Sequence, residues 1–408
     1  MVLWLLIWQR LHGAAPLEAA VLDLLQDLPA SFWPNPCKRV RLWRESGKPV
    51  SGNTAAYNQS RQTIPGLVVG LSCDHMFDQL TLRLAPGRTA ESPGAFLLDG
   101  SSMRLAYSPA LAELFPSGSN QHGVSHWPVM RVLVAHDLET GLAIRPEWGA
   151  MYGPDAVSEQ RLLERAIGRL PAGASVIGDS NFGVFSVAWT ATEQGHPVLL
   201  RLTTARAKRL AGQALQDGID RTVIWKPSRQ DRKSHPDLPP QACVKGRLIV
   251  RRVQPDNGNA PFLLALFTTL PDPAEQILKL YGKRWNIETD LRTLKSQLRM
   301  DQLSSATPEM AAKEIEMAIA AYNLVRAVIA LTAQQTGLAP RDYSFTRAAR
   351  IVESFAPKIA SANTPQEAKR HFDRMMYFLK QAKLPRRHRK PYPRAVWGTG
   401  EKYPKRKK

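Results

Sequence analysis

Four residues with side chains suited to phosphate chemistry occur at fixed spacing in the basic stretch YGKRWNIETDLRTLK. They are Tyr281, Arg284, Glu288 and Lys295. At about 100° per residue of an α-helix, all four fall within an arc of roughly 60°. An apolar stripe occupies an adjoining arc and consists of Ile287, Leu291, Leu294 and Leu298. We therefore expect one helix that buries the stripe and presents the four polar residues beside it.

A glutamate fixed beside a core-packed stripe is suited to binding a divalent cation, because Mg²⁺ requires near-octahedral oxygen geometry. The flanking cations Arg284 and Lys295 suit phosphate groups, and the hydroxyl of Tyr281 can hydrogen-bond to them. Arg292 in the same segment is a further candidate for DNA contact. The alternative interpretation is a surface helix with salt bridges between residues four apart.

Two aspartates follow short apolar runs elsewhere in the chain. In FLLDG and VIGDS, the runs end at Asp99 and Asp179. GAFLLDGSSMRLAYS is predicted to form a strand, a turn and a second strand, and either aspartate alone is typical of a turn. Three converging carboxylates would repel one another unless metal is present. Together with Glu288, the aspartates indicate a site where two divalent ions activate an attacking oxygen and stabilise a leaving oxygen.

The stretch from Tyr281 to Lys295 resembles a known motif. It fits the Y-(2)-R-(3)-E-(6)-K pattern of the DDE transposases of the insertion-sequence-four group without a spacing error. LLDG and IGDSNFG are similar to the two aspartate motifs of that family, and YNLVRA resembles it on the following helix. The second motif departs from the family where Ser180 and Asn181 stand, since an arginine is common there. The resemblance covers roughly residues 50 to 395.

The resemblance implies an RNase H-like core interrupted by a β-rich insertion. It implies Mg²⁺, two ions for which Mn²⁺ can substitute, held by Asp99, Asp179 and Glu288. It also implies cutting and joining of double-stranded DNA at the ends of an insertion sequence by a synaptic homodimer. Trp225 in the insertion is expected to stack on a flipped base, as aromatic side chains do elsewhere, or else to be a core tryptophan.

The pattern of apolar residues predicts an α/β protein with helices packed on a mixed sheet. Five regions are expected: a helical, basic DNA-binding module, two parts of the catalytic core separated by the insertion, and a helical and basic C-terminal region. They span residues 1–88, 89–202, 203–262, 263–335 and 336–408. Residues 383–408 are expected to form an irregular basic arm that binds DNA.

The composition agrees with a polyanionic partner. The chain has 55 Lys and Arg against 35 Asp and Glu, a net charge of +20, and three widely spaced cysteines that form no zinc or disulfide pattern. MVLWLLIW is expected to be part of a buried first helix, and no stretch is expected to cross a membrane. We expect a bacterial cytoplasmic protein associated with the nucleoid through DNA. Two alternatives remain: an RNase H-like nuclease that does not join, and a silent DNA-binding repressor of transposition.

Overall fold

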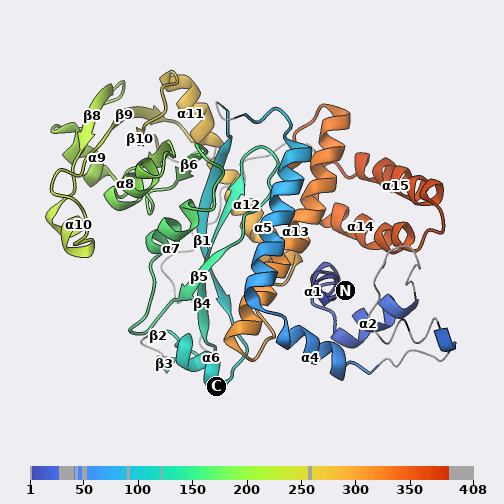
Figure 1. Cartoon of the computed structure of the whole chain (residues 1–408). Coiled ribbons are helices and arrows are strands. Elements are labelled where there is room, and N and C mark those ends of the chain that lie inside the picture. Colours follow the sequence, from blue (N-terminus) through green and yellow to red (C-terminus); the bar gives the residue numbers. More distant parts are fainter. Residues whose placement is uncertain are drawn as a thin grey trace, which may run out of the picture.

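The computed structural model describes residues 2–26, 41, 45–47, 53–89, 92–120, 123–255 and 260–385. Across these ranges, an eight-stranded mixed sheet in the order β5-β4-β1-β6-β7-β10-β9-β8 forms the centre of the molecule. Helices cover both faces of the sheet (Figure 1). The expected fold class, helices packed on a mixed sheet, is confirmed.

Five strands form the half of the sheet that carries the site. They are β5 (Glu147–Ala150), β4 (Val129–Asp137), β1 (Ala95–Arg104), β6 (Ser175–Gly178) and β7 (Val198–Arg201). β4 pairs antiparallel with both β1 and β5, whereas β6 runs parallel to β1 and β7. Three antiparallel strands followed by two parallel ones is the order expected of an RNase H-like core.

The strand that carries Asp99 is continuous, so the expected turn after it was wrong. Asp99 pairs with Val134 in the middle of β1, and the antiparallel register with β4 extends to Arg104. The neighbour on the other side ends earlier, because β6 pairs with β1 only from Ala95 to Leu97. Asp99 therefore lies just past the end of β6 rather than at the end of its own strand.

The alternation of side chains along β1 separates two hydrophobic cores. Leu97 packs in one core, whereas Phe96 and Leu98 pack in the other. The second core lies under α7 (Glu159–Ile167) and α8 (Phe185–Glu193). The first core is covered by helices later in the chain, including α13 (Pro308–Thr336).

Helix α13 is long and apolar enough to cross a membrane, which the sequence analysis did not anticipate. However, 78% of its apolar window is buried inside the protein. It packs along α5 (Gly66–Leu84) and α1 (Val2–Leu11), as Figure 1 shows. Its apolar surface is therefore accounted for by a position in the core.

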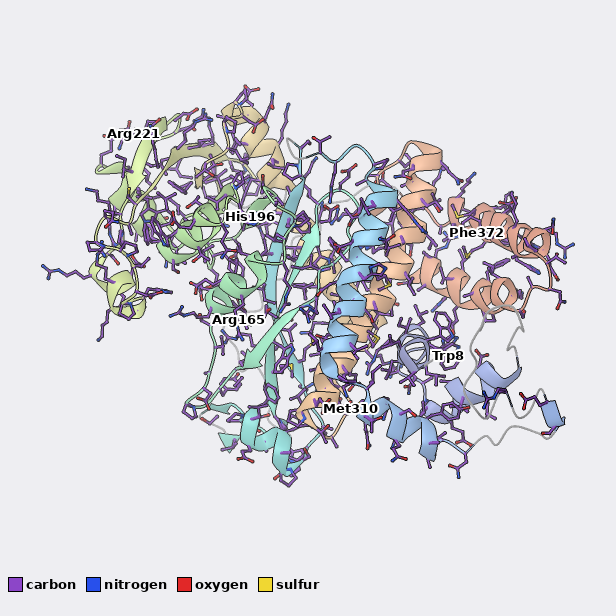
Figure 2. All side chains as sticks on the ribbon, viewed as in Figure 1. Trp8, Arg165, His196, Arg221, Met310 and Phe372 are labelled. Carbon is purple, nitrogen blue, oxygen red and sulfur yellow. The ribbon has the colours of Figure 1, made fainter. Side chains whose placement is uncertain are left out.

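The insertion region continues the main sheet. Residues 203–262 contain α9 (Thr204–Ala211), β8 (Asp220–Trp225), α10 (Arg229–Ser234) and β9 (Val244–Val253), and β10 (Phe262–Thr268) begins at their end. The strands β8 and β9 lie within the region that was expected to be a β-rich insertion. β10 pairs antiparallel with both β7 and β9, so these strands share hydrogen bonds with the core. Arg221 of β8 and Phe372 lie at opposite ends of the molecule (Figure 2).

The remaining elements lie around this centre. They are α2 (Leu17–Gln26), α4 (Ala55–Thr63), α6 (Pro109–Leu114), β2 (Ser119–Asn120), β3 (Gly123–Val124), α14 (Phe345–Ala360) and α15 (Pro365–Lys380). α1 buries Leu5, Leu6 and Trp8, which confirms the expected first helix. Most of the basic stretch at 38–48 and of the predicted C-terminal arm, from residue 386 onward, lies outside the described residues.

The segment with the four spaced residues does not form one helix. α11 (Ala274–Gly282) ends at the glycine, a 3₁₀ turn η1 follows at Lys283–Trp285, and α12 covers Asn286–Gln297. Tyr281 thus belongs to α11, and Arg284 lies in the turn. Glu288 and Lys295 remain together on α12.

Candidate active site

Helix α12 lies against β1 through the predicted apolar stripe. Ile287, Leu291, Leu294 and Leu298 are all buried in the core cluster that lies on that face of the sheet. On the adjoining face, Lys295 Nζ donates a hydrogen bond to Ser101 Oγ at 3.2 Å. Since Ser101 is two residues after Asp99 on β1, the cationic face of α12 is fixed beside that aspartate.

Asp99 and Asp179 meet where β6 ends beside β1. Both side chains are half-buried, and their charges are close enough to interact. Asp99 Oδ1 accepts the N–H of Gly100 at 2.8 Å, and Asp179 Oδ1 accepts the N–H of Asn181 at the same distance. These local hydrogen bonds fix one oxygen of each carboxylate.

The environment of Asp99 disfavours its ionised form. Burial, together with the nearby charges of Asp179 and Glu159, raises the pKa of Asp99 to about 6, although the Gly100 N–H and Arg284 act in the opposite direction. An added cation beside the two aspartates would offset this electrostatic cost.

The third predicted ligand lies apart from the two aspartates. Glu288 is half-buried, and its Oε1 accepts a hydrogen bond from Arg284 Nη2 at 3.1 Å. In the described ranges, no three His, Cys, Asp or Glu side chains lie close enough together to hold a metal ion. The structure thus brings together two of the three predicted ligands and pairs Glu288 with an arginine.

Tyr281 and Arg284 are both buried beside this site, each with 7% of its surface exposed. Burial raises the pKa of Tyr281 to about 12, although the charges of Arg284 and Arg201 favour the phenolate. The Tyr281 hydroxyl oxygen is buried and makes no hydrogen bond of normal geometry with the described residues, although Arg284 lies close enough to interact with it. The hydroxyl therefore lies beside Arg284 in the interior of the site.

Glu159 is a site residue that the sequence analysis missed. It lies in the first turn of α7, where Asn181 Nδ2 donates a hydrogen bond to its carboxylate. A Cβ added to Gly100 would lie 2.4 Å from the Glu159 carboxyl group, so Gly100 allows this side chain to approach Asp99. Nothing in the local pattern indicates this, because an acidic first turn is common in any helix.

The candidate Trp225 and a second tryptophan, Trp285, occupy opposite environments. Trp225 is 7% exposed and packs edge-on against Phe267, with ring centroids 4.9 Å apart, so the expected base-stacking role does not fit and the core interpretation does. Trp285 is 63% exposed and lies next to the site, 4.6 Å from the guanidinium of Arg284. The sequence could have indicated Trp285, because this residue directly follows Arg284 of the motif.

An open groove follows the exposed face of α12. It is lined by Glu288, Leu291, Arg292, Lys295, Ser296, Arg299 and Asp301. Arg292 and Arg299 are exposed, whereas Lys295 is half-buried. The groove thus combines one candidate metal ligand with three cations, which suits a DNA backbone leading to the carboxylates.

Comparison with known proteins identifies the family of this chain. Residues 91–324, more than half of the chain, match the family model described as the transposase DDE domain. The chain belongs to the DDE transposase family. It is also 25% identical over 316 residues to the transposase InsG for insertion sequence element IS4 from Escherichia coli (strain K12), a match that spans 75% of this chain and 68% of that protein.

The matches confirm the resemblance stated from the sequence. The protein is a transposase, its partner is DNA and its function is DNA transposition. Enzymes of the DDE transposase family use divalent metal ions. The residues at the β1–β6 junction fit such an ion, because Asp99 and Asp179 offer carboxylate oxygens that hard cations prefer and their mutual repulsion needs a counter-charge.

A pH dependence of stability is expected for the transposase in EDTA. Because the pKa of Asp99 is raised to about 6 on folding, its contribution is fully present below pH 4 and is lost as the pH rises through 6. The loss should be about 2–3 kcal/mol, at 1.36 kcal/mol per pKa unit. Urea unfolding of wild type and Asp99→Asn between pH 4 and 8 measures this loss of unfolding free energy. A difference between the two proteins that does not vary with pH would contradict the assignment.

Proposed function

We propose that this transposase cuts DNA at the ends of an insertion sequence and joins the freed 3′-hydroxyl to target DNA. Asp99, Asp179 and Glu288 would hold the divalent ions, two Mg²⁺ for which Mn²⁺ can substitute. The observation that carries the proposal is the meeting of Asp99 and Asp179 beneath the cationic face of α12, which Lys295 ties to β1. The bound ions would activate the attacking oxygen and stabilise the leaving oxygen.

The protein's own side chains then have separate tasks. Arg284 is close enough to interact with both Asp99 and Tyr281, so a phosphate held by it and by the Tyr281 hydroxyl would lie beside the carboxylates. A phosphate at Arg284 would also compete with Glu288 for the guanidinium. Glu288 would then be free to join the two aspartates as a ligand, so that DNA binding favours completion of the site.

Trp285 is proposed as the aromatic residue that contacts a base beside the cleavage point. Its exposure and its position next to Arg284 support this role, because an exposed aromatic ring can stack on any base. Two subunits are expected to act as a synaptic homodimer on the terminal repeats. The protein is expected to work in the bacterial cytoplasm on nucleoid DNA.

Cleavage and joining assays test the proposed reaction. A duplex that carries the terminal repeat of the element is incubated with the transposase and target DNA, with Mg²⁺, with Mn²⁺ or with EDTA. We expect nicks at the repeat end and joined products with either metal, and neither in EDTA. Cleavage without joined products would favour the nuclease alternative, and DNA binding without cleavage would favour the repressor alternative.

The groove along α12 is expected to contribute to the salt dependence of DNA binding. Each phosphate contact contributes about 0.9 to the slope of log K against log salt concentration. Arg292→Gln should therefore lower the slope by about 1 while leaving the fold intact, because Arg292 is exposed. Lys369→Gln is the control, since Lys369 lies on α15 and pairs with Asp373 at 2.6 Å. Equal slopes for Arg292→Gln and wild type would exclude this groove as the DNA path.

A further inference from the structure

A buried carboxylate holds α12 from the side opposite the site. Asp290 is 0% exposed and lies two residues after Glu288. Its Oδ1 accepts a hydrogen bond from Arg326 of α13, and its Oδ2 accepts one from Arg341 Nη2 at 2.7 Å. Each carboxylate oxygen thus faces a guanidinium group, so the carboxylate is held from two sides.

The two arginines connect Asp290 to separate parts of the fold. Arg326 Nε donates to the Tyr322 hydroxyl at 2.8 Å on α13. Arg341 lies in the 3₁₀ turn η2 (Pro340–Asp342) and donates to the backbone carbonyl groups of Leu138 and Asp137, just after β4. Three elements, α12, α13 and η2, thus meet at one carboxylate, and Arg341 links them to the end of β4.

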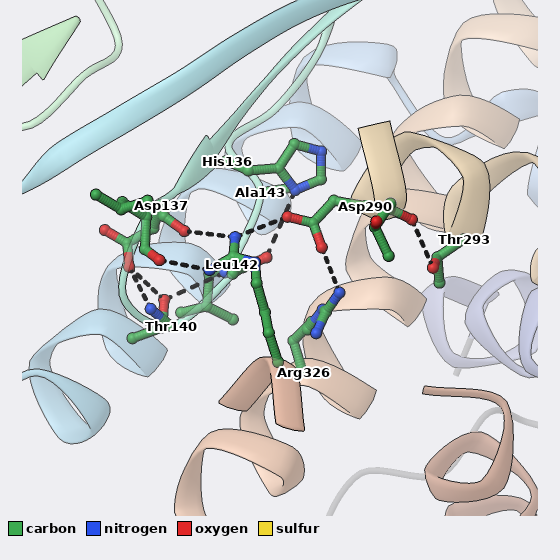
Figure 3. Close-up of polar contacts among 12 residues, drawn as sticks. His136, Asp137, Thr140, Leu142, Ala143, Asp290, Thr293 and Arg326 are labelled. Carbon is green, nitrogen blue, oxygen red and sulfur yellow. Dashed lines mark hydrogen bonds and ion pairs between the residues drawn. The ribbon is translucent and has the colours of Figure 1, made fainter. Parts of the chain in front are cut away.

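Asp290, Arg326 and Arg341 together are called the Asp290 junction below. Neighbouring side chains make the Asp290 junction rigid. Asn323 hydrogen-bonds both the N–H and the carbonyl group of Ala143, at 2.8 Å each, which fixes α13 to the connection after β4. His136 packs edge-on against Tyr322, and burial lowers the pKa of His136 to about 4, so it is neutral at pH 7. Figure 3 shows Asp290 and Arg326 pointing toward one another beside His136 and Ala143.

Helix geometry relates this junction to the site. Two residues correspond to about 200° around a helix, so Asp290 and Glu288 point to nearly opposite sides of α12. The apolar stripe of α12 is non-directional and permits small rotations, whereas hydrogen bonds to a carboxylate depend on direction. A buried ion pair is also weak evidence for stability alone, since apolar residues of similar volume often serve equally well.

We propose that Asp290 is a positioning residue for transposition: by binding Arg326 and Arg341 it fixes the rotation of α12 and holds Glu288 where it can join Asp99 and Asp179 around a divalent ion. The proposal rests on the proposed function, because it assigns Glu288 as a ligand. Asp290 itself touches neither metal nor DNA and acts through the helix.

Metal affinity, measured without any reaction, tests the proposal. Binding of Mn²⁺ to the full chain in complex with duplex DNA is followed by the electron paramagnetic resonance signal of the free ion, with the same DNA alone as the baseline. Loss of a partner that orients a metal ligand typically weakens metal affinity by about 10–100-fold. We expect a rise of this size in the Mn²⁺ dissociation constant for Asp290→Asn. Arg341→Gln, at the edge of the junction, should show the same effect. This variant replaces Asp290→Asn in the test if Asp290→Asn does not fold.

Arg247→Gln is a matched control. Like Arg341, Arg247 is partly buried, pairs with a carboxylate and donates to a backbone carbonyl, in this case Asp220 and Asp272, but it lies in β9. A comparable loss of thermal stability with unchanged Mn²⁺ affinity is expected. Equal weakening of Mn²⁺ binding by Arg247→Gln and Arg341→Gln would overturn the proposal, because the effect would then be a general loss of stability.

A double-mutant cycle separates this proposal from the function on which it rests. If the junction acts through Glu288, adding Arg341→Gln to Glu288→Gln should weaken Mn²⁺ binding by less than about twofold further. Additive losses would overturn the junction's role, as would a loss for Glu288→Gln with none for Arg341→Gln. Unchanged Mn²⁺ affinity in Glu288→Gln would instead overturn the assignment of Glu288, and the proposal with it.

Discussion

Strand cleavage by Asp179→Asn is expected to fall by roughly three orders of magnitude or more, since residues that act as a unit in catalysis fail together. The variant removes a negative charge but keeps an oxygen that can accept the Asn181 N–H, so the turn after β6 should persist. Asp99→Asn and Glu288→Gln should show losses of the same order. Binding to end DNA should change little, because we propose that the cations lining the groove, and not the aspartates, contact the DNA backbone.

Cleavage rates under single-turnover conditions and DNA affinities by fluorescence anisotropy provide the measurement. Asp217→Asn is the control, since Asp217 also accepts a backbone N–H, that of Arg252 at 2.9 Å, but lies in the insertion region. Cleavage by Asp179→Asn within tenfold of wild type would mean that Asp179 is a turn residue and that the metal lies elsewhere.

Leu294→Ala is expected to lower the free energy of unfolding by about 2–5 kcal/mol, the usual cost of emptying a core leucine site. Leu294 is 0% exposed in the stripe that packs α12 on the sheet. The next residue, Lys295, is half-buried on the adjoining face, where it contacts Ser101. Lys295→Gln should therefore cost less than about 1 kcal/mol, as partly exposed polar contacts do, while cleavage falls.

Urea unfolding of the two variants in EDTA compares neighbouring residues on different faces of one helix. The order of the two free-energy changes is decisive. A larger loss of stability for Lys295→Gln than for Leu294→Ala would mean that the polar face of α12, and not the stripe, packs against β1.

Spacing within one helix was the part of the site that the sequence predicted well. The stripe from Ile287 to Leu298 is buried as expected, and Lys295 lies beside the aspartate strand. Local helix geometry determines these positions, so periodicity is sufficient to predict them. The break at Gly282 was harder to place, because a 3₁₀ turn in Lys283–Trp285 preserves the direction of the chain while changing its rotation.

Contacts between segments that are far apart in the chain could not be predicted from the sequence. Asp99-Gly100 has the composition of a turn, but pairing with β4 keeps the chain extended, and this pairing is a tertiary effect. Glu159 contacts Gly100 and affects the charge of Asp99 from a helix that begins well downstream in the chain. Asp290 did give a signal, since on the helical projection it falls close to the apolar stripe, where a charge requires buried partners.

The continuous sheet also determines which strands have unpaired backbone groups. Without β10 and β9, β7 would be an outer strand of the core and its backbone N–H and carbonyl groups would have no partners on that side. The outermost strand is instead β8, where Asp220, Arg221 and Thr222 are exposed. Charged, exposed side chains of this kind discourage strands of other molecules from adding to the sheet. The strands β10, β9 and β8 thus protect the catalytic core from edge-to-edge aggregation.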